Sequence, residues 1–427
     1  MISNWLSTTL GRRNIHYSWV MVAVTFLTVL VSAASISAPG VFIVPLEKEF
    51  GWSNAQISTA LSIRLLLFGL VAPFAAALMN RYGLRNVVVS ALSLILAGML
   101  ASLFMTQVWQ LVLLWGFIVG FGTGMTALVL GATVAARWFS ARRGLVVGIL
   151  GASSATGQLV FLPLMASLTE NHGWRAAMLF LCLLMLMVAI AVLLLVRDRP
   201  SDLALRPFGD DGSQPLAPVP PAHGPIMASA LGALKEASAS RTFWVLFATF
   251  YICGASTNGL IQTHFISFCG DFNLPATGAA TLLAAMGIFD FVGTILSGWL
   301  SDRYDNRWLL FWYYGLRGLS LLFLPFSDFS FYGLSLFAMF YGLDWFATVP
   351  PTVRLSASTF GPERANLMFG WIFTGHQLGA ASIALAAGMS RTYLLSYLPA
   401  FFVAGALCLI AALIALSINR DKKLAVA

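Results

Sequence analysis

Long apolar segments separated by short polar interruptions make up most of the chain. Each is close to the roughly 20 residues that a helix needs to cross a bilayer. Cut at polar, Gly and Pro positions, the pattern predicts membrane helices over 18–42, 55–79, 86–105, 108–134, 143–168, 174–196, 242–268, 276–300, 308–326, 331–353, 365–388 and 392–418. We therefore expect an all-α membrane protein with twelve transmembrane helices.

Composition supports this class and indicates two halves. Hydrophobic residues make up 59% of the 427 residues and charged residues 9%, which is too apolar for a soluble core to bury. Between 197 and 241 seven prolines alternate with Asp, Gly and Ser, as is typical of a solvated linker. We expect a six-helix bundle in 1–196, a cytoplasmic linker over 197–241 and a second six-helix bundle in 242–427.

The basic residues predict the orientation in the membrane. The net charge is +8, yet 19 of the 24 Lys and Arg residues fall on one side of the predicted topology. Lys48, Arg175 and Arg391 fall on the other side, and Arg64 and Arg317 lie within helices. This asymmetry places both termini in the cytoplasm of a bacterial inner membrane, and it accounts for the charge without a nucleic-acid partner.

Other short motifs predict structure rather than chemistry. The four cysteines lack CxxC spacing, so we expect neither a disulfide framework nor a metal site, and no cofactor is indicated. The consecutive prolines Pro350 and Pro351 should kink or break the helix over 331–353. Glycines inside the apolar segments are attributed to close helix packing; they include Gly116, Gly120, Gly122, Gly124, Gly148, Gly151 and Gly157.

The two halves repeat each other in the loop after their second helix. This loop reads LMNRYGLR at 78–85 and LSDRYDNR at 300–307. Both copies resemble the G-x-L-x-D-R-x-G-x-R signature of the major facilitator superfamily. The resemblance implies alternating access, with the halves rocking about a midplane site and with Arg81, Asp302 and Arg303 acting in gating. The first copy has Asn80 where the second has its acid.

A narrower resemblance is to the branch that contains monocarboxylate transporters and oxalate/formate antiporters. It rests on the stretches WFSARRGLVVG at 138–148, HYSW at 16–19 and GWR at 173–175. That branch often carries an Asp-x-x-x-Arg pair in its eighth helix, where this chain has Asp290 and Thr294. The resemblance implies a small organic anion as substrate.

Five ionisable side chains lie near the middle of predicted helices: Arg64, Asp290, Arg317, Asp344 and His376. A charge at the bilayer centre costs roughly 2.5 to 3.5 kcal/mol, so each needs a partner, a water-filled cavity or a function. Arg64 has no carboxylate within the membrane part of its own half. An anionic substrate could supply that partner, whereas the alternatives are a pair with Asp290 or snorkelling.

The remaining charges divide between coupling and structure. Desolvation favours the neutral carboxyl, so Asp290 or Asp344 could bind a proton near physiological pH. Arg317 is expected to pair structurally with an acid, preferably Asp344, which leaves Asp290 for proton coupling. His376 could shuttle protons or serve as a hydrogen-bonded packing residue.

Uncharged polar residues at helical spacing give further candidates for substrate hydrogen bonds. Tyr251, Asn258 and Gln262 share one helical face in the seventh helix. Thr123 in the fourth helix and Gln158 in the fifth are the other candidates, although packing between helices explains a threonine equally well.

These features predict a proton-coupled or exchange transporter of a small organic anion, and we expect it to be a monomer. The alternative is efflux of amphipathic drugs or metabolites, which a preference for cations would favour. A membrane enzyme is not expected, since motifs such as HExxH are missing from the sequence.

Overall fold

The computed structural model describes residues 2–126, 129–210 and 226–418. Within these ranges the backbone is helical almost throughout and contains no strand; one isolated bridge joins Phe139 and Phe208. A few helical side chains, among them Asn80 and Gln158, lie outside the described part of the structure.

Six long helical rods form the first half, and a short helix precedes them. The helices are α1 (Ile2–Gly11), α2 (Ser18–Ser37), α3 (Pro39–Phe50), α4 (Asn54–Tyr82), α5 (Leu84–Ser102), α6 (Val108–Leu111), η1 (Val112–Val119), α7 (Gly120–Thr126), α8 (Val129–Trp138), α9 (Arg143–His172) and α10 (Trp174–Leu195). The pair α2–α3 forms the first rod, and the series α6–η1–α7–α8 forms the fourth.

The second half repeats this plan after the linker region. Its elements are η2 (Pro200–Leu203), α11 (Ile226–Ser238), α12 (Arg241–Gly254), η3 (Ala255–Gln262), α13 (Thr263–Gly270), α14 (Ala276–Ser301), α15 (Asn306–Phe323), η4 (Leu324–Phe326), α16 (Phe331–Asp344), α17 (Val349–Phe360), α18 (Pro362–Tyr393) and α19 (Leu398–Ala415). Among the described residues, nine rods of the two halves are long and apolar enough to cross a membrane by length and composition.

Single glycines join consecutive rods at three places. Gly83, Gly173 and Gly361 have φ values of +88°, +84° and +85°, a region that side-chain-bearing residues rarely adopt. Each ends one helix and begins the next, so the chain reverses within one residue. The predicted ends at 79, 168 and 353 fall short of these glycines, because each helix continues to the residue before its glycine.

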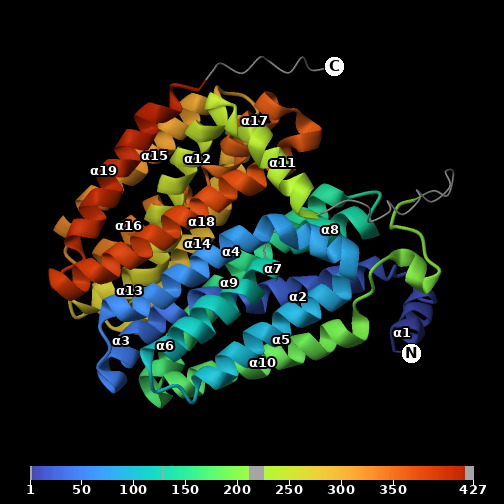
Figure 1. Ribbon diagram of the computed structural model, residues 1–427, viewed down its shortest axis with the longest axis horizontal. Helices are drawn as coiled ribbons and strands as arrows, with labels where there is room; N and C mark the ends of the chain where they lie inside the picture. Colours follow the sequence, from blue (N-terminus) through green and yellow to red (C-terminus); the bar gives the residue numbers. More distant parts are fainter. Residues whose placement is uncertain (1, 127–128, 211–225, 419–427) are drawn as a thin grey trace.

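Two groups of helices lie against each other in Figure 1, one coloured blue to green and the other yellow to red. The halves meet mainly where α4 packs along α18 and where α9 packs along α14. Within this contact the Ser62 hydroxyl of α4 donates to the Ala381 carbonyl of α18 at 2.7 Å. We call the end that contains α8, α11 and α17 the basic end, and the end that contains α3, α6 and α13 the opposite end.

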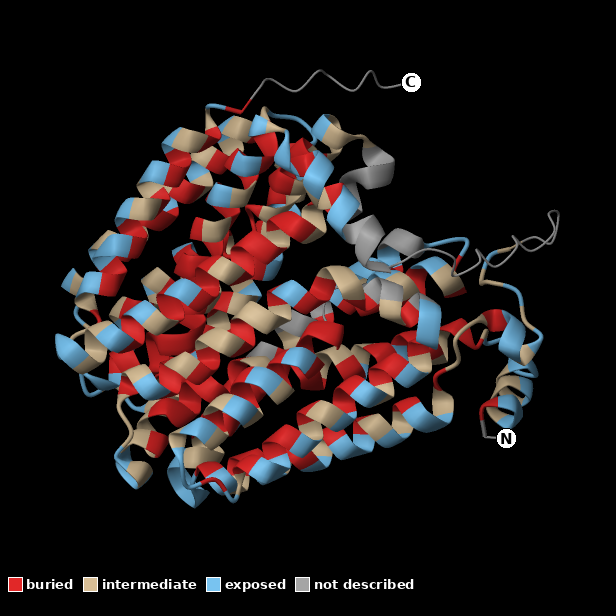
Figure 2. Cartoon of the chain, in the orientation of Figure 1, coloured by how far each residue is buried: buried red, intermediate tan, exposed pale blue. Residues whose placement is uncertain are grey.

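The outward faces of the peripheral helices are apolar and exposed. Figure 2 shows exposed residues along the outer flank of α10, and these include Leu179, Leu183 and Leu186. On α15 the exposed side chains Trp312 and Leu316 follow the same helical spacing. Such faces suit contact with acyl chains, as expected for a multi-pass membrane protein.

Some predicted helix boundaries were wrong. The first rod continues to Phe50 instead of ending near 42, because Pro39 begins a new helix, α3, where its missing N–H costs nothing. The predicted break before Pro350 and Pro351 is confirmed: α16 ends at Asp344, and α17 begins at Val349 with proline in its first turn.

Candidate functional site

The first and fourth rods of each half are the irregular ones. The first rod breaks between α2 and α3, and the tenth breaks between α16 and α17. The fourth and seventh rods contain the π-helical segments η1 and η3. Interruptions of this kind free backbone groups from the regular ladder and often mark functional sites. Nothing in the hydrophobic pattern signalled the π-helical segments.

Arg64 donates hydrogen bonds to the backbone where the first rod is interrupted between α2 and α3. Its side chain is buried in the middle of α4, where Nη1 donates to the Ser35 carbonyl at 3.1 Å and Nη2 donates to the Ile36 carbonyl at 2.8 Å. A regular helix would pair the Ser35 carbonyl with the N–H of residue 39, which is a proline and has none. The guanidinium therefore contacts backbone of its own half rather than Asp290, and its contact with a substrate anion stays a prediction.

Asp290 accepts a hydrogen bond from the backbone where the tenth rod is interrupted between α16 and α17. This buried carboxyl of α14 accepts through Oδ1 from the Phe346 N–H at 2.9 Å and from the Thr294 hydroxyl at 3.0 Å. Ser297, two turns further along α14, donates to the Ala347 carbonyl at 2.5 Å. Thr294, one turn after Asp290 on α14, thus supports the acid with a neutral hydrogen bond.

Arg317 and Asp344 form the structural pair that the sequence predicted. Arg317 Nε lies 2.6 Å from Asp344 Oδ2, and the arginine side chain is fully buried. Nη2 also donates to the carbonyls of Asp344 and Trp345, the second at 3.1 Å. The broken turn is therefore held by α14 through Asp290 and by α15 through Arg317.

The candidates on the seventh and eleventh rods lie in a closely packed contact. His376 Nε2 is 3.5 Å from the Thr257 hydroxyl, and its ring stacks on Phe373. A side chain at Gly254 would overlap the His376 backbone, so the two helices touch there. This arrangement fits the packing alternative for His376, while a role in proton transfer stays a prediction.

The other polar candidates on the seventh rod are Tyr251, Asn258 and Gln262. Among the described residues, no hydrogen bond joins their side chains to one another. Tyr251 is half-buried on α12, and Gln262 is buried at the end of η3. The Asn258 carbonyl accepts from the Thr263 hydroxyl at 2.7 Å, which satisfies a backbone group within the π-helical segment. Gln158 falls on a side chain outside the described part of the structure.

Thr123 lines a small pocket near the middle of the first half. The pocket has a volume of about 140 Å³ and is walled by residues of α2, α4, α7, α8 and α9. We call it the midplane pocket, since Ser32, Phe68 and Thr123 each fall near the middle of their rods. Of the substrate-binding candidates named from the sequence, it contains Thr123.

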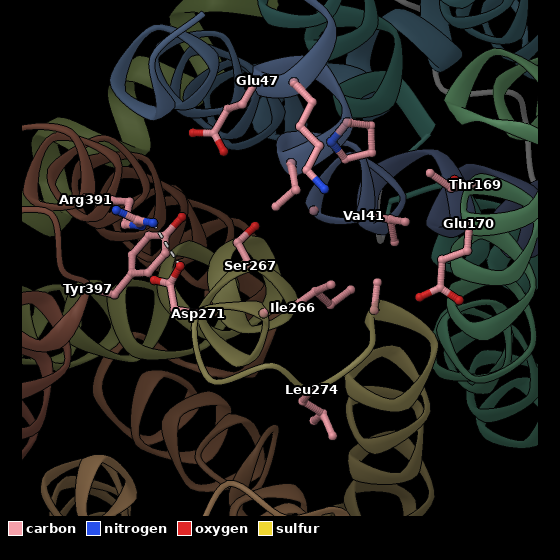
Figure 3. Close-up of a pocket in the computed structure, with 16 residues that line it drawn as sticks. Val41, Glu47, Thr169, Glu170, Ile266, Ser267, Asp271, Leu274, Arg391 and Tyr397 are labelled. Atoms are coloured by element: carbon pink, nitrogen blue, oxygen red, sulfur yellow. Dashed lines mark hydrogen bonds and ion pairs between the residues drawn. The ribbon is translucent and has the colours of Figure 1, made fainter. Parts of the chain in front are cut away.

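A larger pocket of about 660 Å³ lies between the halves at the opposite end. Figure 3 shows Glu47 from α3 and Glu170 from α9 facing Asp271, Arg391 and Tyr397 of the second half across this space. We call it the end pocket. Its charged lining carries both signs, and its one ion pair among the described residues joins Arg391 Nη2 to Asp271 Oδ1 at 2.9 Å.

Hydrogen bonds between the halves close the opposite end. Glu170 Oε1 accepts from the Thr277 N–H at 3.0 Å and Oε2 accepts from the Thr277 hydroxyl, at the start of α14. Asn54 Nδ2 donates to the Tyr397 hydroxyl at 2.7 Å. Gly40 approaches the carbonyls of the seventh rod so closely that an added side chain would lie 3.0 Å from them.

Replacing Glu170 by glutamine is expected to loosen this end. An exposed carboxylate at a helix N-terminus contributes up to about 1 kcal/mol, so the open population should rise by up to about fivefold. The measurement is the rate at which a maleimide labels Leu274→Cys in detergent; the four native cysteines are buried. Glu49→Gln is the matched control, because Glu49 bonds Trp174 and Arg175 within the same half. Equal rates in wild type and Glu170→Gln would contradict the assignment.

Comparison with known families agrees with this architecture. The sequence profile of the Major Facilitator Superfamily matches residues 25–381 and, in a second alignment, residues 266–426. The chain belongs to the major facilitator superfamily. Its relatives are named as transporters, as expected for a protein that is not an enzyme.

Curated relatives cover most of this superfamily member. Monocarboxylate transporter 13 of Bos taurus is 27% identical over 92% of this chain and 87% of its own length. The uncharacterised MFS-type transporter YcxA of Bacillus subtilis is 22% identical over 90% of this chain and 92% of its own length.

Solved structures confirm the fold. A D-xylose–proton symporter superposes with a TM-score of 0.70 at 15% identity, over 95% of this chain and 99% of that one. A bacterial homologue of the human lysosomal transporter Spinster, in an inward-facing and occupied conformation, has a TM-score of 0.72 at 14% identity over 94% and 97% of the two chains.

The superfamily signature loops lie at the basic end, where Asp302 pairs with Arg354 of α17. Arg303 lies 4.1 Å from the Trp299 ring centroid, and Arg81 lies over Tyr82. The gating role of Arg81, Asp302 and Arg303 stays a prediction. Arg354 was not identified from the sequence, although its place at the basic end of the tenth rod was a usable signal.

The sequence analysis also did not identify Asp198. This residue makes a hydrogen bond in the first signature loop that Asp305 makes in the second. In the second loop, the Asp305 carboxylate accepts from the Arg307 N–H at 3.0 Å. The first loop has Gly83 at the position of Asp305, and there Asp198 accepts from the Arg85 N–H at 2.9 Å. A side chain at Gly83 would come within 2.6 Å of Asp198. The segment after α10 thus completes the helix start that Asp305 provides in the second half.

Proposed function

We propose that this superfamily member carries a small organic anion, a carboxylate, together with a proton by alternating access. The substrate class is supported by similarity to monocarboxylate transporters over nine-tenths of the chain. Coupling is supported by one observation above all: Asp290 is a buried acid whose hydrogen-bond donors, among the described residues, are an amide N–H and a hydroxyl.

The chemistry of Asp290 suits a proton switch. Its Oδ1 receives both hydrogen bonds, so Oδ2 is the atom that takes up the proton. Hydrogen bonds to an ionised carboxylate are roughly twice as strong as those to a neutral group. Protonation therefore weakens the hold of α14 on the Phe346 N–H and frees the broken turn of the tenth rod to move. One proton carried with one carboxylate makes the transport cycle electroneutral.

The same proposal assigns the orientation. The basic end faces the cytoplasm of a bacterial inner membrane, with both termini on that side, because short loops rich in Lys and Arg remain there. The end pocket then faces the periplasm. The closed contacts at that end correspond to a state in which the substrate path is shut on the periplasmic side.

Asp290→Asn tests the coupling. The amide keeps an oxygen to accept from Phe346 and Thr294 but cannot exchange a proton, so uphill accumulation of a carboxylate driven by an inward proton gradient should fall to background. Counterflow, which needs no net proton movement, should remain within about twofold of wild type. The measurement is uptake of a panel of labelled carboxylates into proteoliposomes, with and without the gradient.

Asp328→Asn is the matched control, because Asp328 is an exposed acid in the connection between η4 and α16. It should accumulate substrate as wild type does. Gradient-driven accumulation by Asp290→Asn would remove Asp290 from the coupling mechanism. Transport of amphipathic cations with no carboxylate transport would favour an efflux function instead.

A further inference from the structure

The midplane pocket is a mainly apolar chamber within the first half. Its walls include Val29 and Ile36 of α2, Phe68 of α4 and Leu150 of α9, and none of the described residues that line it is ionisable. At about 140 Å³ it is close to the roughly 150 Å³ of an engineered apolar protein cavity that binds benzene. A charged group gains nothing from such walls, whereas a hydrocarbon group of that size does.

One buried hydroxyl among the described residues of this pocket has no hydrogen-bond partner. Thr123 and Thr126 donate their hydroxyls to backbone carbonyls of the fourth rod. The Ser32 hydroxyl is buried, with 3% of the residue exposed, and has no hydrogen-bond partner among the described residues. A buried hydroxyl without a partner costs free energy unless a ligand or water satisfies it. Ser32 thus offers a single hydrogen bond beside an apolar chamber.

Two glycines of α9 show where the chamber can be filled. Most glycines of the first half meet a neighbour, as expected for close packing, but that expectation was wrong for Gly148 and Gly151. A Cβ atom built on either glycine meets no described atom within 4 Å outside the backbone of α9 itself. Gly151 lines the midplane pocket and Gly148, one turn earlier, does not.

We infer that the midplane pocket receives the apolar part of the transported anion, a group about the size of a benzene ring, beside the Ser32 hydroxyl. The substrate class is then an aromatic or bulky branched monocarboxylate rather than a short hydroxy acid. This inference rests on the proposed function. It restricts the substrate class according to the volume and apolar lining of the midplane pocket.

Gly151→Leu tests the inference with benzoate and acetate as probes. Wild-type protein in proteoliposomes should transport benzoate with a kcat/KM about tenfold or more above that for acetate, because filling an apolar pocket discriminates by such factors. Leucine at 151 occupies the chamber, so benzoate transport should fall about tenfold or more while acetate transport changes less than twofold. Gly148→Leu is the matched control and should leave both rates unchanged.

The outcomes separate this inference from the proposed function. Equal loss of benzoate and acetate transport in Gly151→Leu would overturn the apolar-chamber assignment, as would wild-type transport of acetate in preference to benzoate. Transport of neither probe nor any other carboxylate by wild type would refute the proposed function itself, and this inference with it. Benzoate transport lost in Gly151→Leu and kept in Gly148→Leu supports both.

Discussion

Replacing Arg317 by methionine is expected to destabilise the protein by about 3 to 5 kcal/mol, the usual cost of breaking a buried ion pair. The substitution leaves Asp344 as a buried acid without its cation and removes two donors from the broken turn of the tenth rod. A change of this size should lower the thermal unfolding midpoint in detergent by many degrees. The midpoint can be read from the fraction of protein that stays monodisperse after heating.

A double variant separates charge burial from lost packing. Arg317→Met combined with Asp344→Leu removes both charges, and apolar replacements for a buried pair are often close to neutral. It should therefore recover much of the stability lost in Arg317→Met alone. If Arg317→Met alone has the same thermal unfolding midpoint as wild type, the pair contributes nothing to stability.

Arg64→Ala is expected to reduce uptake of every substrate to background. The substitution leaves the Ser35 and Ile36 carbonyls without their donors inside the membrane, and hydrogen bonds to a charged group contribute about 1.5 to 3 kcal/mol each. The interruption between α2 and α3 should therefore lose the hydrogen bonds that satisfy its carbonyls. The measurement is proteoliposome uptake together with the thermal midpoint.

The conservative variant Arg64→Lys distinguishes two roles for this residue. If the guanidinium holds the break in the first rod, lysine should lower the thermal midpoint, because one ammonium cannot reproduce the two forked bonds. If it anchors the anion, lysine should raise KM with little change in the midpoint. Normal uptake by Arg64→Ala would contradict both roles.

Much of the charge network was predictable because a buried charge in a membrane must find a partner. Arg317 and Asp344 were paired from the sequence on that ground, and the salt bridge confirms the prediction. For Arg64 the same rule predicted a partner outside its own half, but the structure supplies two carbonyls of the first rod. Pro39 showed that a carbonyl of the first rod would lack its usual donor, but only the packing of α4 against that rod brings Arg64 to it.

The sequence by itself determined the membrane class, the repeated halves and the break before Pro350 and Pro351. These depend on local properties: the length of apolar runs, the repetition of a loop and the missing N–H of proline. Only the tertiary structure decided which carbonyls Arg64 binds, that Asp198 serves the first signature loop, and that Gly151 opens onto a chamber while Gly120 packs against α4. Those contacts join residues far apart in the chain, so they depend on how helices are rotated and how closely they pack, and the order of residues in one helix does not fix either.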